Sequence, residues 1–519
     1  MAVARAQLRP AVGTPGRLRA ALARPRAAHV AVAAILAFYV ATRASMVARM
    51  PYIGDEGWHG TFVVQVSDSL SNLWVSLTIA KEPLVIWIAA LFTKVGFEPM
   101  AALRVVSLLA GLATVVVVGL FARHIGGRAA GLAAMAIGAV LPFWLVLDTL
   151  GLMDALIAAE VAAALYLQVR LAERPRLSTA LGLGFVLAAA VLTKESGKSA
   201  VALLPVSLLV FDWASPGVRE RLVRWAGCAA LAVGLAGLAY LWMRSSSLWG
   251  EAEAQRRIPI QYPVRPLSAA LDDPITALKH SVPEYRADLR WYFTIPFLLL
   301  AAGGWVLLLR ERLRLALLLT IWIIVPLTAA LLLPYSPYAR HIMFLTPALV
   351  VLAGIGLARG VAFVAARWGR RRAGPAAIAV GVALAFTPAL VLDARILVDP
   401  AGAKYPGADT YQYVQGPSGG AIWPDVAHDI RERTAGRPAI VLKSAAVTFV
   451  LEFLLDDPKV TFVYGEDPRA KRAKLIVQDT LPFPDPAGQP LLDSGRFRLV
   501  RTYHRPRDGY IVRLYERKS

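Results

Sequence analysis

Cysteine is almost absent from this chain of 519 residues, and the single one, Cys228, lies inside an apolar run. One cysteine excludes a disulfide within the chain and any metal site built on cysteine pairs. Charged residues are also scarce, at 18%, where soluble domains usually carry about a quarter. The hydrophobic fraction is 57% and the mean hydropathy is +0.54. These values predict a polytopic membrane protein.

Nucleotide-binding motifs are missing too: no Walker loop and no Gly-x-Gly-x-x-Gly stretch opens a helix. Lys and Arg outnumber Asp and Glu by 56 to 35, which gives a formal charge of +21. In a soluble protein this excess would suggest nucleic acid, but membrane proteins accumulate arginine in cytoplasmic loops as an orientation signal. We therefore expect the lipid bilayer as a partner and no nucleic acid.

Apolar runs of helical length alternate with short polar breaks through residues 28–394. Arginine-rich breaks are typical of the cytoplasmic side, and here they alternate with breaks that collect carboxylates. The pattern predicts an all-α polytopic domain of about eleven helices in the inner or plasma membrane, preceded by a disordered cytoplasmic N-terminus, residues 1–27. The expected spans are 29–47, 103–121, 130–147, 156–169, 179–192, 200–211, 225–242, 291–309, 315–333, 343–357 and 376–392.

Two segments depart from this pattern. The apolar run 85–92 is too short to span a bilayer and predicts an interfacial or re-entrant helix. Residues 244–290 are too polar to cross and predict a long external loop.

From residue 395 onward the apolar runs shorten to strand length, which predicts a small extracytoplasmic α/β domain over 395–519. The expected strands are 439–442, 460–464, 475–478, 497–503 and 510–515, with helical spacing at 424–432 and 445–455.

Two adjacent carboxylates, Asp55 and Glu56, follow the first apolar run, in the stretch Met50–His59. The bilayer is expected to end there, so a carboxylate can stay ionised and act as a base. Other polar residues fall on the same predicted external side: Lys81, Glu82, Asp148, Asp154, Lys194, Glu195, His280, Glu284, Arg286, Arg290, Arg340 and His341. Together they suit a reaction on a phosphate-bearing lipid, in which cations hold the phosphate and a carboxylate takes a proton.

Each of these residues also has an ordinary interpretation. A lone Asp or Lys at a helix end is usually a solvated flank, and Tyr335 and Tyr338 fit an aromatic belt as well as a binding role. The convergence of both charge signs on one side favours a site, because a charge at a membrane helix centre costs about 2.5 to 3.5 kcal/mol.

The order of Asp55-Glu56, Lys81–Leu84, Met153–Leu156, Leu192–Lys194 and Ala339–His341 resembles the GT-C membrane glycosyltransferases. The most similar group is the protein O-mannosyltransferase and lipid A aminoarabinose transferase-like branch, and the resemblance covers about residues 28 to 395. It implies a polyprenyl-phosphate sugar donor, and transfer with inversion to an extracytoplasmic lipid, glycan or protein acceptor.

The resemblance also implies residue roles. Asp55 is expected to be the general base, with Glu56 supporting or orienting the acceptor. The donor phosphate would be held by Lys81, Lys194 and Arg340, with Arg286 or Arg290 as further candidates. Sugar or acceptor contacts are expected from Asp154, Glu82, His59 and Tyr338.

The sequence departs from the family pattern at two positions. Glu82 replaces a Pro or Lys, which leaves open whether Lys81 or Glu82 meets the phosphate, and Glu195 replaces a Gly, where it can partly neutralise Lys194. Some relatives bind a divalent metal near Lys81, so a metal held by Glu82 with His280 stays open.

Two other classes remain open as well. A lipid-linked-sugar flippase or other transporter should show broken helices in both halves. A non-catalytic membrane scaffold would tolerate loss of Asp55 and Lys81.

Overall fold

The structure is a computed structural model that describes residues 25–258, 264–368, 374–443, 449–465, 467–479 and 488–518. The expected disordered N-terminus lies, up to residue 24, outside the described residues, as does the start of the helix expected at 445–455.

Seven helices in the described part of the chain are long and apolar enough to cross a membrane. An eighth span results if α14 and α15, which meet at a bend of 94°, count together. The elements concerned are α2 (Pro25–Val47), α5 (Pro99–Gly126), α8 (Asp154–Glu173), α11 (Val218–Arg244), α14 (Pro274–Trp291), α15 (Ile295–Glu311), α16 (Leu313–Leu332), α17 (Thr346–Trp368) and α18 (Gly374–Val398). A multi-pass membrane protein is thus confirmed, and the number eleven stays a prediction.

The expected spans that fall short are shorter or interrupted helices. The run 130–147 divides into α6 (Arg128–Ala139) and α7 (Pro142–Leu147), and 179–192 is the 17-residue α9 (Leu177–Thr193). The run 200–211 divides into α10 (Lys198–Ala202) and a 3₁₀ turn, Leu204–Val210. Proline at 142 and 205 lacks the N–H that would continue an α-helix, which explains both breaks.

The segment predicted as a polar external loop is largely helical. It contains α12 (Trp249–Arg256), α13 (Leu267–Asp272) and α14. Helix α14 leads into α15 through the 94° bend described above. No helix within 244–290 is by itself among the candidate spans of the described residues, and the external position of this segment stays a prediction. Its polar composition reflects helices with one face exposed, not irregular backbone.

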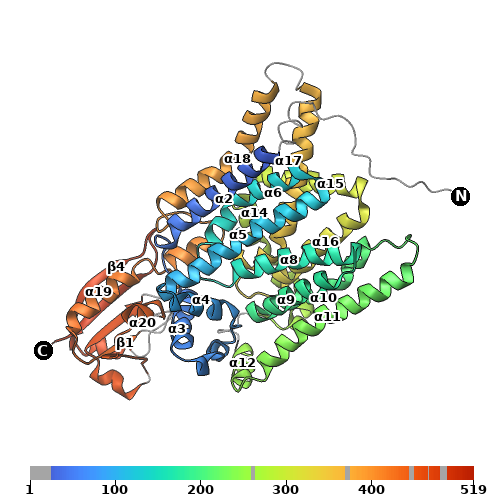
Figure 1. The fold of residues 1–519 in the computed structure, drawn as a ribbon. Helices are drawn as coiled ribbons and strands as arrows, with labels where there is room; N and C mark the ends of the chain where they lie inside the picture. Colours follow the sequence, from blue (N-terminus) through green and yellow to red (C-terminus); the bar gives the residue numbers. More distant parts are fainter. Residues whose placement is uncertain are drawn as a thin grey trace.

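Two short helices lie at the end of the helical bundle where the sheet also lies (Figure 1). They are α3 (Gly54–Asp68), which carries Asp55 in its first turn, and α4 (Leu84–Lys94), the short helix expected after Pro83.

The C-terminal part contains one five-stranded sheet in the order β2-β1-β3-β5-β4. All five strands lie where the sequence predicts them: β1 (Ala439–Lys443), β2 (Val460–Val463), β3 (Leu475–Asp479), β4 (Phe497–His504) and β5 (Ile511–Arg517). Strand β1 pairs parallel to β2 and β3, and β5 pairs antiparallel to β3 and β4. The helices α19 (Trp423–Thr434) and α20 (Phe449–Leu455) share a hydrophobic core with the sheet.

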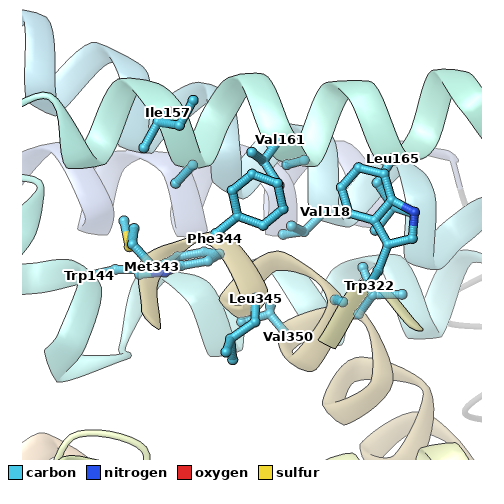
Figure 2. Packing of buried hydrophobic residues seen from close by; sticks show 14 of the residues in the cluster. Val118, Trp144, Ile157, Val161, Leu165, Trp322, Met343, Phe344, Leu345 and Val350 are labelled. Atoms are coloured by element: carbon cyan, nitrogen blue, oxygen red, sulfur yellow. The ribbon is translucent and has the colours of Figure 1, made fainter. Parts of the chain in front are cut away.

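Large aromatic side chains fill the core beneath the segment that carries Arg340 (Figure 2). Trp322 of α16 stacks on Phe344 with ring centroids 5.9 Å apart. The indole of Trp144 donates a hydrogen bond of 3.0 Å to the Thr346 hydroxyl at the start of α17. These contacts fix the 3₁₀ segment Ala339–Leu345 against three helices.

Glycines allow α15 and α17 to pack closely. A Cβ on Gly304 would lie 2.0 Å from the carbonyl oxygen of Leu352, and one on Gly356 would lie 2.0 Å from that of Leu300. Small residues of this kind let membrane helices approach each other backbone to backbone.

We expect Gly304→Ala to lower the free energy of unfolding by about 1 to 3 kcal/mol, because its methyl group would press on helix backbone that cannot rotate away. Gly303→Ala is the matched control, since nothing lies within 4 Å of its Cβ position. Thermal unfolding of both variants in detergent checks this, and equal midpoints would contradict it.

Candidate active site

The start of α3 is held in place by the C-terminal part of the chain. Ile53 forms a β-bridge with Gly419, and the Gly54 N–H donates to the Ser418 carbonyl over 3.0 Å. Further along α3, the rings of Trp58 and Phe449 lie 3.9 Å apart, so α20 packs directly on this helix. The segment with Asp55 therefore lies between the helical bundle and the sheet.

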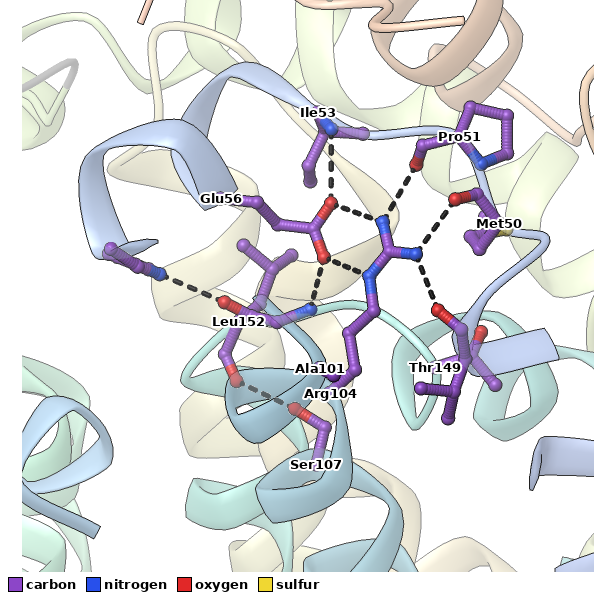
Figure 3. Close-up of polar contacts among 12 residues, drawn as sticks. Met50, Pro51, Ile53, Glu56, Ala101, Arg104, Ser107, Thr149 and Leu152 are labelled. Atoms are coloured by element: carbon purple, nitrogen blue, oxygen red, sulfur yellow. Dashed lines mark hydrogen bonds and ion pairs between the residues drawn. The ribbon is translucent and has the colours of Figure 1, made fainter. Parts of the chain in front are cut away.

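Glu56 forms a bidentate ion pair with Arg104 of α5, with both N–O distances at 2.8 Å (Figure 3). Its two oxygens also accept hydrogen bonds from the Ile53 and Gly151 N–H groups, at 3.1 and 2.6 Å. Arg104 donates in addition to the Met50 carbonyl at 2.8 Å. Both side chains are fully buried and their polar atoms are occupied. This geometry argues against the expected contact of Glu56 with an acceptor: Glu56 positions the turn that carries its neighbour.

Asp55 points to a different partner. Its carboxylate accepts a hydrogen bond of 2.6 Å from the Arg340 guanidinium, and its side chain is 35% exposed. Burial alone would raise the pKa of Asp55, but the charges of Arg340 and Lys81 outweigh it and hold the pKa well below its usual range. The carboxylate is therefore ionised at neutral pH and accessible to a ligand.

His59 lies one turn along α3. Its Nδ1 is 2.9 Å from the Gly151 carbonyl oxygen, and because a carbonyl only accepts, Nδ1 must carry the proton. Burial lowers the pKa of His59, so the ring is neutral and its buried Nε2 has an unshared lone pair without a partner among the described residues.

Lys81 lies within a cluster of charged side chains around Asp55. Asp55, Arg340, Lys194 and Glu82 all lie close enough for their charges to act on it, and burial lowers its pKa. It forms no ion pair within 4 Å with any described residue. An unpaired cation beside an ionised carboxylate is suited to hold a ligand anion.

A second ion pair joins the ends of two helices. Lys194, which follows α9, donates to Asp154 at the start of α8 over 2.6 Å. The expectation that Glu195 neutralises Lys194 was wrong: Glu195 instead pairs with Lys198 at 2.5 Å and faces Arg256 at 3.7 Å.

Glu82 turns away from Lys81. It pairs with Arg256 of α12 at 3.3 Å, and burial together with the charge of Glu195 raises the pKa of Glu82 to about 7. The pairing of Glu82 with His280 at a metal finds no support, since no group of three His, Cys, Asp or Glu is placed to hold a metal among the described residues.

The remaining candidates divide between two places. Tyr338 belongs to the cluster, with the Arg340 guanidinium 5.4 Å from its ring centre. Arg286 and Arg290 are exposed on α14, and Arg290 lines a cavity whose walls include no member of the Asp55 cluster. The structure therefore unites Asp55, Lys81, Lys194, Asp154 and Arg340, and leaves Arg286 and Arg290 outside.

Comparisons with known proteins show which families and solved structures this chain is similar to. The family model described as dolichyl-phosphate-mannose-protein mannosyltransferase matches residues 80–242. ArnT from Cupriavidus metallidurans in the apo state is 16% identical, with 93% of this chain and 97% of that chain covered at a TM-score of 0.58. Oligosaccharyltransferase from Archaeoglobus fulgidus is 13% identical, with 88% and 70% covered at a TM-score of 0.57. No curated protein matches the chain.

The chain has the GT-C fold of the mannosyltransferase and ArnT type. The resemblance that the short sequence motifs indicated is thereby confirmed. At these identities the structural likeness establishes the fold, and the chemistry of this GT-C chain must be argued from its own residues.

Sequence reasoning missed three residues that shape the site of this GT-C chain: Arg104, Arg256 and Asp409. The first two are arginines that pair with carboxylates distant in sequence, so spacing carries no signal for them. Asp409 is buried next to the segment that bears Arg340 and accepts a 2.7 Å hydrogen bond from the Tyr292 hydroxyl. No motif or periodicity in the sequence singles out Asp409.

Burial raises the pKa of Asp409 to about 7, against the hydrogen bond from Tyr292 and the charge of Arg340, which lower it. The folded protein thus keeps a proton that an unfolded Asp loses near pH 4. Stability should therefore fall as the pH rises from about 4 to 7, by at most about 1.4 kcal/mol per pH unit.

We expect Asp409→Asn to remove this part of the pH dependence, because an amide keeps the hydrogen bond from Tyr292 and does not ionise. Asp425→Asn, at an exposed position on α19, is the control. Unfolding midpoints measured between pH 4 and 8 check this, and a slope unchanged by Asp409→Asn would contradict it.

Arg104→Leu should cost about 3 to 5 kcal/mol, because it leaves the Glu56 carboxylate buried without its counter-ion. The double change Arg104→Leu with Glu56→Leu should recover part of that loss. Denaturant unfolding of the single and double variants measures the difference, and a double variant less stable than Arg104→Leu would argue against this cause.

Proposed function

We propose that this chain transfers a sugar from a polyprenyl-phosphate carrier to a hydroxyl or amine of an extracytoplasmic lipid, glycan or protein, with inversion at the anomeric carbon. The observation that carries the proposal is the ionised, partly exposed carboxylate of Asp55 next to Arg340 and the unpaired Lys81. The fold supports it, since ArnT from Cupriavidus metallidurans has been crystallised bound to undecaprenyl phosphate.

In the proposed reaction Asp55 accepts the proton of the acceptor group as that group attacks the anomeric carbon. The new glycosidic bond forms while the bond from carbon to phosphate oxygen breaks on the opposite side, which inverts the configuration. Lys81, Arg340 and Lys194 stabilise the charge that develops on the departing polyprenyl phosphate. Asp154 orients Lys194 through their 2.6 Å ion pair.

The low pKa of Asp55 makes it a weak base in the free protein. A donor phosphate would compete for Arg340 and Lys81, and so weaken the two interactions that lower this pKa. Donor binding would thereby raise the basicity of Asp55 at the moment when an acceptor needs deprotonation.

Contacts to sugar or acceptor would come from His59, Tyr338 and Glu82. His59 and Glu82 are both buried in the free protein, so these contacts would require local movement when a ligand binds. The Nε2 of His59 would then accept a hydrogen bond from a sugar hydroxyl, and Glu82 would have to leave Arg256. The part of the chain around the sheet, residues 395–519, would recognise the acceptor outside the cell, because α20 packs on the helix that carries Asp55.

This proposal includes the topology inferred from the arginine-rich loops. Residues 1–27 would lie in the cytoplasm, and residues 28–394 would form the catalytic membrane domain with about eleven crossings. A lipid-linked-sugar flippase is the second candidate, favoured by the 94° break between α14 and α15, because broken helices are typical of transporters.

Asp55→Asn should reduce sugar transfer by about 100- to 10,000-fold, the usual contribution of a general base. Release of polyprenyl phosphate from a panel of polyprenyl-phosphate sugars is measured with purified protein in lipid and with candidate acceptors present. Asp68→Asn, exposed near the end of the same helix, is the control and should keep full activity. Equal release by wild type and Asp55→Asn would exclude Asp55 as the base, and movement of labelled donor across vesicles without release would favour a flippase.

A further inference from the structure

A large cavity lies away from the Asp55 cluster, beside α18. It has a volume of about 1250 Å³ and is bounded by the bend between α14 and α15, one side of α18, and the segment 404–415. A second cavity of about 600 Å³ shares Val391, Arg395, Lys404 and Arg507 with it. Because these four lining residues are common to both, the two cavities form one continuous groove.

One wall of the groove is apolar and open to the side. Trp291, Ile295, Leu384 and Val391 line it, and their exposed fractions are 57%, 54%, 66% and 43%. Leu384 and Val391 belong to α18, one of the helices apolar enough to span a membrane. The exposed side of such a helix faces lipid chains, so the groove opens laterally into the bilayer.

The other end of the groove is strongly basic. Arg290, Arg395, Lys404 and Arg507 line it, against the carboxylates of Asp508 and Asp399. The side chains of Arg290, Arg395 and Lys404 form no ion pair with any described residue. Several unpaired cations crowded at one place repel each other and favour a ligand of opposite charge.

The position of these cations matches a lipid headgroup. Arg395 lies in the last turn of α18, where a spanning helix leaves the hydrocarbon region, and Arg290 lies in the last turn of α14, at the bend that precedes α15. Arg507 is fixed by its Nε, which donates to the Gly402 carbonyl over 2.8 Å, while Gln415 donates to the Arg507 carbonyl over 2.8 Å. The basic end is therefore held by the segments that connect the membrane helices to the sheet.

We propose that this groove binds an anionic phospholipid of the surrounding leaflet, with its phosphate among Arg290, Arg395, Lys404 and Arg507 and one hydrocarbon chain along α18. Charge complementarity and the lateral apolar opening together select a lipid over a free anion, because a free anion would leave the apolar wall empty. This site is separate from the Asp55 cluster and does not rest on the proposed sugar transfer.

A lipid bound in the groove would also affect the Asp55 cluster indirectly, through the segment 405–410. Tyr405, Gly407 and Thr410 line the groove, and Asp409 of the same segment accepts the hydrogen bond from Tyr292 next to the turn with Arg340. A lipid in the groove would therefore contact the segment 405–410 and restrict its movement next to the turn with Arg340.

The test uses the full chain in detergent and a phosphatidylglycerol with a photoreactive diazirine in one acyl chain. The expected labelling lies within residues 287–296 and 384–395, and a phosphatidylcholine probe with the same chain should label them far less. The double variant Arg395→Gln with Lys404→Gln should bind phosphatidylglycerol about 30-fold more weakly, since each cation at an anionic leaflet contributes about fivefold.

The matched control is Arg310→Gln with Arg312→Gln, which removes two cations at the far end of α15 and should leave the labelling unchanged. If the double variant does not fold, Lys404→Gln alone, at an exposed position, gives the same comparison with an expected loss of about fivefold. Equal labelling of the variant and wild type, equal labelling by the two lipids, or suppression of labelling by millimolar inorganic phosphate would overturn the proposal.

Discussion

The buried ion pair between Glu56 and Arg104 fixes the geometry on which the candidate site depends. It ties the first turn of α3 to α5, and through further hydrogen bonds to the backbone at Met50 and Gly151. Two charges at this depth are costly to desolvate, so the pair is stable only because every polar atom has a partner. With Glu56 committed to structure, the adjacent Asp55 is left to face Arg340 and the open side of the cluster.

The cluster itself balances carboxylates against cations. Asp55 with Arg340 and Asp154 with Lys194 are two close pairs. The charges of Asp55, Arg340 and Lys194 act on Lys81, which has no ion pair of its own among the described residues. An added phosphate would change this balance, because it would attract Lys81 and Arg340. Glu82 is a carboxyl group paired with Arg256, so of the two neighbours Lys81 and Glu82 only Lys81 is suited to contact a phosphate.

The sequence predicted the features that depend on periodicity and order along the chain. The five strands follow from short apolar runs, and the grouping of Asp55, Lys81, Asp154, Lys194 and Arg340 follows from motifs at helix ends that were expected on one side of the membrane. What it could not predict were pairings across the fold. The pairs Glu56–Arg104 and Glu82–Arg256 form only when the helices pack, and the same packing places Arg290 at a separate cavity. Pro142 and Pro205 could have predicted the helix breaks, because proline cannot continue an α-helix. The apolar runs around them are long, however, and so suggested uninterrupted helices.

The most direct test of this account is an experimental structure of the full chain with bound polyprenyl phosphate. We expect phosphate oxygens within about 4 Å of the side-chain nitrogens of Lys81 and Arg340, the distance range of an ion pair. We also expect the Asp55 carboxylate to lie next to the phosphate, with Arg340 shared between the two anions. A phosphate bound only between Arg290 and Arg395, with Lys81 and Asp55 unchanged, would contradict it.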